Sequence, residues 1–356
     1  MTKDSNHIRV NIIVPVYNAK NTLKRCVMSL QKQTLRDVCI ILVDDGSTDG
    51  SGALCDKIAA KDDRIRVIHK ENGGSDSARF AGIKAICDGE YTTFCDADDY
   101  IPKDGVEKLY ALAIEENAEV VSGTLRRFAK NVIYMKRCIP NSLKVRRTYN
   151  KEQIMNGIIP SYFGVTDFPG YLHTKLYSNL LIKKSVEFQR PVKFFQEDIA
   201  FNLQILFGTN RLAVMPDVVY CYRMGGGTSR FMPSFLEDCV ALYKFKMEQI
   251  KKNNLPESLR YTTAIELKNE LWTWFEMYYC QYEKKYTKQQ IGTEIERACK
   301  LESIVEAVNY PKEDFSGMQG FRELVKEKNI EGIYELLENN KRKHRVKKML
   351  KRILLG

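Results

Sequence analysis

The chain contains a short apolar strand that runs straight into three carboxylates, Thr92-Thr93-Phe94-Cys95-Asp96-Ala97-Asp98-Asp99-Tyr100. Carboxylates crowded at the end of a strand repel one another unless a positive charge lies between them. A divalent cation such as Mg2+ or Mn2+ takes oxygen ligands of this kind and often shares them with the phosphates of a substrate. The alternative interpretation is a solvated turn, since Asp is a common turn residue. The stretch alone leaves both interpretations open.

Apolar runs alternate with helical patterns through the first 125 residues. The runs that we expect to be strands are 10–16, 38–43, 65–69, 91–95 and 119–122. Between the first two, Leu23, Cys26, Val27 and Leu30 follow the spacing of a helix face. This alternation predicts a βαβ series, and therefore an α/β fold with a mostly parallel sheet that binds its ligands at the carboxyl ends of the strands.

The turns after four of these runs are rich in Asp, Asn and Gly. They read Pro15-Val16-Tyr17-Asn18, Asp44-Asp45-Gly46-Ser47, Asn72-Gly73-Gly74-Ser75 and Asp96-Ala97-Asp98-Asp99. Because parallel strands end at one edge of their sheet, we expect the four turns to build a single cleft.

The composition narrows the class of protein. The 356 residues carry a formal net charge of +11, of which eight positive charges lie in residues 341–356, so the first 340 residues carry only +3. This weakly basic body argues against a nucleic-acid binder. No apolar run is long enough to span a bilayer and the start has no secretory apolar core, so we expect a cytoplasmic protein.

The cysteines and histidines do not suggest disulfides or zinc. Ten cysteines include no Cys-x-x-Cys pair, and several lie in expected buried strands, so we predict reduced, packed thiols. The four histidines are widely separated and form no metal-binding pattern.

The chain beyond residue 125 divides into three parts. Residues 126–232 are irregular, with a helix expected from 198 to 207 and a strand from 211 to 223. Residues 233–340 are helical and aromatic, and the stripe around 271–275 indicates either a packed core or a subunit contact of an oligomer. Residues 341–356 form a basic tail.

Three common classes of enzyme lack their motifs here. The turn after the first strand has no Gly-x-Gly-x-x-Gly, and no glycine is followed by lysine, which excludes a dinucleotide fingerprint and a P-loop. Gly73-Gly74-Ser75-Asp76-Ser77 lacks the last glycine of a hydrolase elbow. What remains is a cleft for a nucleoside diphosphate in which acids and a metal replace the P-loop.

Five ordered motifs give the chain a specific resemblance. They are Ile12-Ile13-Val14-Pro15-Val16-Tyr17-Asn18, Leu42-Val43-Asp44-Asp45-Gly46-Ser47, Asn72-Gly73-Gly74, Asp96-Ala97-Asp98-Asp99 and Glu197-Asp198. Over residues 8–230 the chain resembles the family 2 glycosyltransferases. The resemblance implies a GT-A fold, with a nucleotide-sugar-binding half at 8–125 and an acceptor-binding half at 126–232. It also implies inverting, metal-dependent transfer from a UDP-sugar to a glycan or lipid-linked acceptor, as in the synthesis of bacterial surface polysaccharides.

The same resemblance assigns roles on the donor side. Pro15 and Tyr17 would border the nucleobase, and Asp45 would accept a hydrogen bond from it, which suits the ring N–H of uracil. Arg79 would help to hold the nucleotide, and Asp96 would approach the ribose. Asp98, as part of a DXD motif, would ligate a Mn2+ or Mg2+ ion that bridges the two phosphates.

On the acceptor side the resemblance implies a catalytic base. A hydroxyl that attacks opposite the leaving group must lose a proton, and Asp198 at the start of the expected helix is the candidate for taking it. Glu197 would orient Asp198 or contact the acceptor. The competing interpretation is that Asp198 only caps the helix.

Two further segments carry weaker signals. Residues 171–177 resemble the acceptor-side segment of the family, and we expect an apolar helix there in which His173 and Lys175 are structural. Residues 225–230, Gly-Gly-Gly-Thr-Ser-Arg, are either a mobile loop that closes over the diphosphate or a plain connector.

Two other functions stay as alternatives. A sugar-1-phosphate nucleotidyltransferase has a related sheet, but it needs a Gly-rich basic loop where this chain has Pro15-Val16-Tyr17-Asn18. A membrane-associated scaffold without activity could keep the fold but would not need Asp98 or Asp198, and both are present.

The basic tail predicts peripheral binding to a membrane. Its apolar residues fall on one helical face and its Lys and Arg residues on the other, which suits an anionic surface such as the inner face of the cell membrane. The alternatives are a solvated or disordered tail and an RNA-binding tail, although no aromatic residues interleave its charges. Removing residues 341–356 should lower binding to anionic vesicles and leave donor hydrolysis intact, which vesicle sedimentation and an assay of UDP release would measure. Equal sedimentation of the two proteins would refute the membrane role.

Overall fold

The computed structural model describes residues 8–129, 132–134, 139–164, 167–224, 232–281, 286–310 and 320–341. The chain divides into two compact units, residues 1–230 and 231–356. The expected loop at 225–230 and the tail beyond residue 341 lie outside the described residues.

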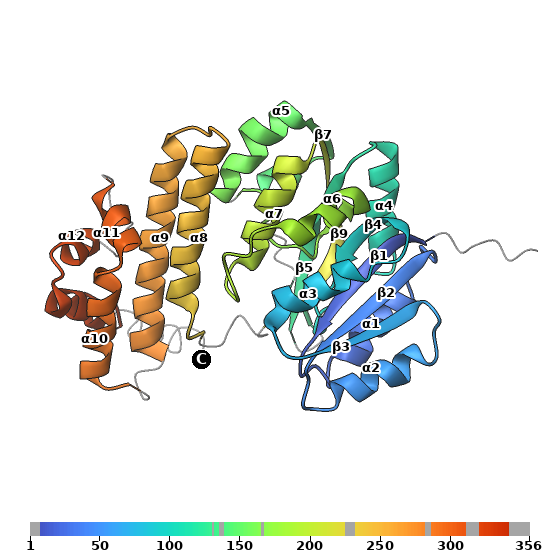
Figure 1. Cartoon of the computed structure of the whole chain (residues 1–356), viewed down its shortest axis with the longest axis horizontal. Helices are drawn as coiled ribbons and strands as arrows, with labels where there is room; N and C mark the ends of the chain where they lie inside the picture. The colour runs from blue at the N-terminus through green and yellow to red at the C-terminus, as the bar shows by residue number, and fades with distance from the viewer. Residues whose placement is uncertain are drawn as a thin grey trace, which may run out of the picture. The chain divides into compact units, whose positions relative to one another are not determined.

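The first unit is built on one sheet (Figure 1). Its described strands are β1 Ile8–Val16, β2 Val38–Asp45, β3 Ile65–Lys70, β4 Gly89–Phe94, β5 Val120–Ala129, β6 Val132–Tyr134, β7 Arg147–Asn150, β8 Lys175–Ser178 and β9 Arg211–Arg223. They follow the order β3-β2-β1-β4-β8-β5-β9-β7, and β6 pairs with β5. The strands β1 to β4 and the pair β5 and β9 run parallel, and the other pairs are antiparallel.

Helices pack on both faces of this sheet. The first unit contains α1 Leu23–Gln31, α2 Ser51–Ala59, α3 Gly74–Lys84, α4 Gly105–Glu115, α5 Lys151–Gln153, α6 Asn179–Lys184 and α7 Glu197–Gly208, with the short turns η1 Asn141–Leu143, η2 Ile154–Ile158, η3 Ile159–Tyr162 and η4 Ser185–Glu187. Ile12 and Val14 of β1 join the core under α1 and α4. Ile13 faces the other way, toward Gly82 of α3, where a Cβ would come within 2.5 Å of its side chain.

The strands expected in the first 125 residues all form, and so do the strand at 211–223 and the helix that begins at Glu197. Continuous apolar runs such as β2, which is buried along its whole length, are typical of strands covered on both faces. The structure also shows that β5 crosses residue 125, so the expected boundary between the two halves falls inside a strand.

The expected helix at 171–177 is wrong, because residues Lys175–Ser178 form the strand β8. This strand lies between β4 and β5 and pairs antiparallel with both. Four residues are too few to show a strand period, and pairing with two long neighbours determines their conformation.

The second unit is helical among its described residues. It contains α8 Phe235–Lys252, α9 Ser258–Glu276, η6 Met277–Gln281, α10 Lys288–Cys299, α11 Glu302–Asn309 and α12 Phe321–Lys326. Trp272, Trp274 and Phe275 of α9 are buried, and Trp274 stacks on Phe235 with ring centroids 5.9 Å apart. The aromatic stripe is therefore core, and an oligomer through this region stays a prediction.

Two findings concern the described residues as a whole. None of the helices that they form is both long and apolar enough to cross a bilayer. The eight cysteines among them are all free, and seven of these are buried, which agrees with packed thiols.

Candidate functional site

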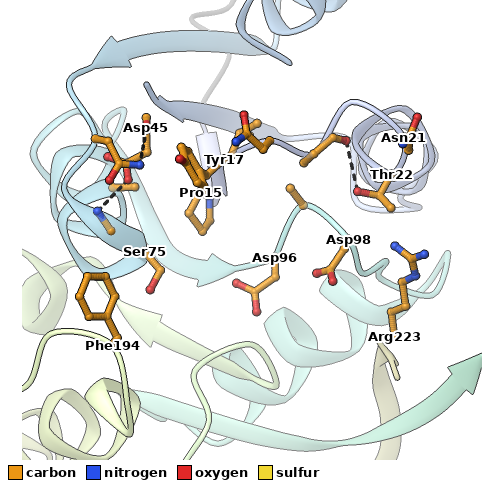
Figure 2. Close-up of a pocket in the computed structure, with 17 residues that line it drawn as sticks. Pro15, Tyr17, Asn21, Thr22, Asp45, Ser75, Asp96, Asp98, Phe194 and Arg223 are labelled. Carbon is orange, nitrogen blue, oxygen red and sulfur yellow. Dashed lines mark hydrogen bonds between the residues drawn. The ribbon is translucent and has the colours of Figure 1, made fainter. Parts of the chain in front are cut away.

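A cavity of about 730 Å3 opens at the carboxyl ends of the parallel strands (Figure 2). All four Asp-, Asn- and Gly-rich turns contribute to it, so they meet as the sequence predicts. Its wall is formed by Pro15, Val16, Tyr17, Asn18, Ala19, Asn21, Thr22, Asp45, Asn72, Gly74, Ser75, Ala78, Asp96, Ala97, Asp98, Phe194 and Arg223. Of the expected site residues, Pro15, Tyr17, Asp45, Asp96 and Asp98 line this cavity.

The turn after β1 is rigidly tied to the turn after β2. Asn18 adopts a left-handed conformation with φ 48°, its N–H donates to Ser47 Oγ, and its side-chain oxygen accepts from the N–H of Thr48 at 2.8 Å. The neighbouring Tyr17 leaves 54% of its surface exposed at the cavity wall. An exposed, amphipathic ring on a fixed turn can stack on a flat ligand group.

Asp45 is an anchor for the turn after β3. Its carboxylate is almost fully buried and accepts three hydrogen bonds: from Lys70 Nζ at 2.5 Å, from the N–H of Gly73 at 3.0 Å and from the N–H of Gly74 at 2.8 Å. Gly74 has φ +88°, a conformation that L side chains rarely adopt. A carboxylate has about four lone-pair positions, so one more donor can still be accepted, and the expected contact with a base stays a prediction.

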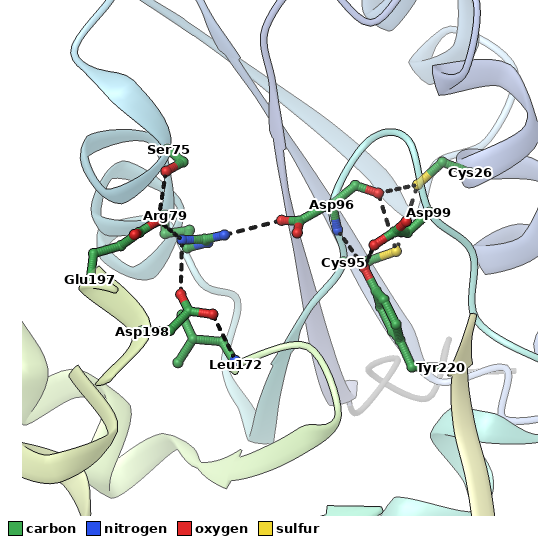
Figure 3. Close-up of polar contacts among 10 residues, drawn as sticks. All are labelled: Cys26, Ser75, Arg79, Cys95, Asp96, Asp99, Leu172, Glu197, Asp198 and Tyr220. Atoms are coloured by element: carbon green, nitrogen blue, oxygen red, sulfur yellow. Dashed lines mark hydrogen bonds and ion pairs between the residues drawn. The ribbon is translucent and has the colours of Figure 1, made fainter. Parts of the chain in front are cut away.

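Arg79 of α3 joins three carboxylates from distant parts of the chain (Figure 3). Its guanidinium contacts Asp96 Oδ1 at 3.1 Å, Glu197 Oε1 at 3.1 Å and Asp198 Oδ1 at 3.2 Å. Burial disfavours its charge, yet the three carboxylates raise the pKa of Arg79 above its ordinary value. Arg79 therefore stays protonated and holds the cluster together, and its expected contact with a nucleotide stays a prediction.

The same guanidinium acts on the protonation of Asp96. Burial alone would raise the pKa of Asp96, but the neighbouring Arg79 and His173 lower it below the ordinary value. Asp96 therefore remains ionised at the cavity wall. One guanidinium does not neutralise three ionised carboxylates, so the charge of the cluster depends on whether Asp198 is protonated.

The pKa of Asp198 is shifted in the direction opposite to that of Asp96. Asp198 Oδ2 accepts from the N–H of Leu172 at 3.1 Å, while Oδ1 faces Arg79. Burial, together with the neighbouring Glu197 and Asp96, raises the pKa of Asp198 to about 7 against the opposing effect of Arg79. A carboxylate with a pKa near neutrality can take up a proton and release it again.

Glu197, the residue before Asp198, also belongs to the cluster. Ser75 Oγ donates to Glu197 Oε1 at 3.0 Å, and Ser75 itself lines the cavity. The start of α7 is therefore tied to the turn after β3. Arg79, Glu197 and Asp198 are not among the residues that line the cavity. Arg79 connects both acids to Asp96 of the wall, and Ser75 of the wall also contacts Glu197.

Asp98 and Asp99 are neighbours in the turn after β4 but have different surroundings. The carboxylate of Asp98 points into the cavity, as Figure 2 shows, and within the described part of the chain no other residue donates a hydrogen bond to it. Burial and the nearby Asp96 raise the pKa of Asp98. An unsatisfied carboxylate oxygen beside a second carboxylate suits a hard divalent cation.

Asp99, to which the sequence assigns no role, fastens the turn to β9. It is 1% exposed, accepts from Tyr220 Oη at 2.7 Å and from the N–H of Arg223 at 2.6 Å, and burial raises its pKa to about 8. The Tyr220 hydroxyl also accepts from the N–H of Asp96 at 3.0 Å. Sequence reasoning missed Tyr220, whose only signal is its place in the strand pattern of 211–223.

The donor set for a metal is incomplete in the protein alone. Over the described ranges, no three His, Cys, Asp or Glu side chains come together as a metal cluster. The oxygens available are those of Asp98, with Asp96 beside it. Such a site fits Mg2+ or Mn2+ only if water and the phosphates of a ligand supply the remaining oxygens.

Comparisons with known proteins agree with this geometry. Residues 11–176 match the family model of Glycosyl transferase family 2. The chain is 34% identical over 216 residues to the uncharacterized glycosyltransferase EpsJ of Bacillus subtilis strain 168, a match that spans 60% of each protein. It is 30% identical over 249 residues to the glycosyltransferase GlyG of Streptococcus pneumoniae serotype 4, covering 67% of this chain and 79% of GlyG.

A solved structure shares the fold. The crystal structure of S. aureus TarS 1–349 in complex with UDP-GlcNAc superposes with a TM-score of 0.67 at 19% identity, over 94% of this chain and 92% of that one. This likeness confirms the GT-A fold that the sequence predicts.

The contacts of Tyr220 predict a loss of both stability and nucleotide binding in Tyr220→Phe. The change leaves the N–H of Asp96 without its acceptor and the carboxylate of Asp99 with only the N–H of Arg223, which should cost about 1–3 kcal/mol of unfolding free energy and weaken UDP binding. Urea denaturation and titration calorimetry would measure the two effects. Tyr91→Phe is the matched control, because it removes a buried bond to Ala118 O away from the cavity. Equal UDP affinity of the two variants would contradict the prediction.

Proposed function

The chain belongs to glycosyltransferase family 2, and on that premise we propose that it transfers a sugar from a UDP-sugar to a hydroxyl of a glycan or lipid-linked acceptor, with inversion. The observation that carries the proposal is the connected set of carboxylates at the cavity. Asp98 faces the cavity without a donor from another described residue, and Asp96 links it through Arg79 to Asp198. The binding of UDP-GlcNAc to TarS supports a nucleotide-sugar donor.

The donor would occupy the cavity of about 730 Å3, which has the size of a small-molecule site. In this proposal Tyr17 and the backbone at Pro15 contact the base, Asp45 accepts its N–H, and Asp96 approaches the ribose. Asp98 would hold a Mn2+ or Mg2+ ion, which stabilises negative charge on a leaving diphosphate.

Asp198 would act as the general base. The acceptor oxygen attacks the anomeric carbon on the face opposite the diphosphate, the bond from that carbon to the diphosphate oxygen breaks, and the hydroxyl proton passes to Asp198. Arg79 and the N–H of Leu172 fix both carboxylate oxygens, so the base is oriented before the acceptor arrives. Glu197 beside it would contact the acceptor.

The tail and the relatives support a proposal for the setting of the reaction. EpsJ and GlyG are named as glycosyltransferases, and a basic amphipathic tail would bring the protein to the inner face of a membrane that carries a lipid-linked acceptor. A surface polysaccharide is the product class that fits both.

Asp98→Ala should abolish the part of UDP binding that depends on a divalent cation. Loss of one charged contact costs about 1.5–3 kcal/mol, which corresponds to about a 10- to 100-fold weaker Kd with Mn2+ present. Titration calorimetry with UDP, in Mn2+ and in EDTA, measures the difference. Asp104→Ala removes an exposed carboxylate paired with Lys108, away from the cavity lining, and should behave as wild type. If Mn2+ increases the UDP affinity of Asp98→Ala as much as that of the wild type, the metal assignment is wrong.

Asp198→Asn should keep UDP binding and lose transfer by about 100- to 10,000-fold, because an amide cannot take the proton. In the wild type, Asp198 must be ionised to act, so kcat should rise with pH through about 7. The measurement is UDP release from UDP-GlcNAc, UDP-glucose and UDP-galactose in Mn2+. Glu197→Gln is the matched comparison, and it should lower kcat for UDP release far less than Asp198→Asn because it keeps the base. Wild-type turnover by Asp198→Asn would exclude this base.

A further inference from the structure

Lys175 binds the segment at 169–172, whose Leu172 N–H contacts Asp198. Lys175 lies at the start of β8, and its Nζ donates to Pro169 O and to Tyr171 O, each at 2.6 Å. The next N–H along the segment, that of Leu172, donates to Asp198 Oδ2 at 3.1 Å. The side chain of Lys175 therefore fixes the carbonyls of Pro169 and Tyr171, which come just before the N–H of Leu172 that contacts Asp198.

Other side chains complete the hold on this segment. Tyr162 Oη also donates to Pro169 O at 3.0 Å, and Asn202 Nδ2 donates to Gly170 O at 2.6 Å. A Cβ at Gly170 would come within 2.2 Å of Ile199 on α7, so the segment lies directly against the helix that carries Asp198. Three successive carbonyls are thus bound by side chains, although loop carbonyls commonly face water.

The backbone of Lys175 is also held in place by its neighbours in the sheet. The Lys175 backbone is in register with Ser122 of β5, and Thr93 Oγ1 of β4 donates to Lys175 O at 2.7 Å. The side chain therefore connects the middle of the sheet to the segment at 169–172. The rings of Phe168 and Tyr171 cover its ammonium, with centroids 5.3 and 5.5 Å away.

A positive charge on Lys175 costs free energy because the side chain is fully buried. The residue is 0% exposed, and no carboxylate within the described ranges is close enough for an ion pair with it. Burial lowers the pKa of Lys175 to about 7, against an opposing effect of Asp198. If Lys175 only filled space, an apolar side chain such as Met would do so without this cost.

We infer that Lys175 is a positioning residue for sugar transfer: it holds the carbonyls of Pro169 and Tyr171 so that Leu172 fixes Asp198, and its charge favours the ionised form of that base. This inference rests on the proposed function, in which Asp198 is the base. Lys175 is not among the residues that line the cavity, and its hydrogen bonds go to the segment whose Leu172 contacts Asp198.

The groups that influence the charge of Asp198 come from several elements. They are Arg79 and Asp76 of α3, Glu197 of α7, Asp96 after β4, Lys175 and Tyr177 of β8, and Tyr162 of η3. Among these groups, only Arg79 and the protonated form of Lys175 are cations. Loss of either positive charge should therefore make Asp198 harder to ionise.

The test is Lys175→Met in the full-length chain, a change that keeps the length and volume of the side chain. We expect UDP binding to stay at the wild-type level, and kcat for UDP release to fall by about 100-fold. The acid limb of the pH profile, measured from about pH 5 to about pH 9, should move up by about one unit. The donor is the UDP-sugar of the panel above that wild type turns over fastest.

Tyr162→Phe is the matched variant. It removes one donor to Pro169 O but keeps the charge of Lys175. Its kcat should fall less, and its acid limb should stay where it is in the wild type. Wild-type UDP binding by both variants shows that the site has folded.

The outcomes separate this inference from the function on which it rests. If Asp198→Asn turns over normally, the base assignment fails. If Asp198→Asn is inactive while Lys175→Met keeps the wild-type kcat and acid limb, only the role of Lys175 is overturned. A loss of kcat with equal shifts of the acid limb in Lys175→Met and Tyr162→Phe would likewise overturn the role of the charge.

Discussion

The pairing of one buried guanidinium with three acids is the constraint on which the site depends. Arg79 comes from α3, Asp96 from the end of β4, and Glu197 and Asp198 from the start of α7. None of these acids could be buried so near the others without a cation among them. The contact therefore fixes how the strand-end turns of the parallel half meet the segment that follows β8. It also leaves the cluster with negative charge in excess of its one guanidinium when all three acids are ionised.

The parallel half of the fold was predictable because its signals are local. Long apolar runs predict β1, β2 and β4, and the polar turns that follow them predict the place of the cavity. The start of α7 was predictable as well, since Glu197 and Asp198 precede a clear helical pattern. In each case a few neighbouring residues carry the information.

The parts that were missed depend on contacts between distant residues. Arg79 and Asp198 are 119 positions apart, and Tyr220 and Asp99 are 121 apart, so no local pattern connects them. The strand β8 owes its conformation to β4 and β5 on either side. Lys175 looked structural for the same reason, because its role becomes visible only once the segment at 169–172 is seen beside Asp198.

The antiparallel insertion of β8 has a consequence for how the protein is made. During synthesis β4 leaves the ribosome long before residues 175–178, which form its partner strand β8. The strand β5 likewise leaves the ribosome long before residues 211–223, which form its partner strand β9. Until then the nascent chain presents an unpaired edge of Tyr91, Thr92 and Thr93, and such an edge can template wrong pairing. The order of synthesis therefore makes the parallel half of the sheet dependent on sequence that is translated after it. A nascent chain that stalls before β8 would expose that edge to chaperones or to aggregation.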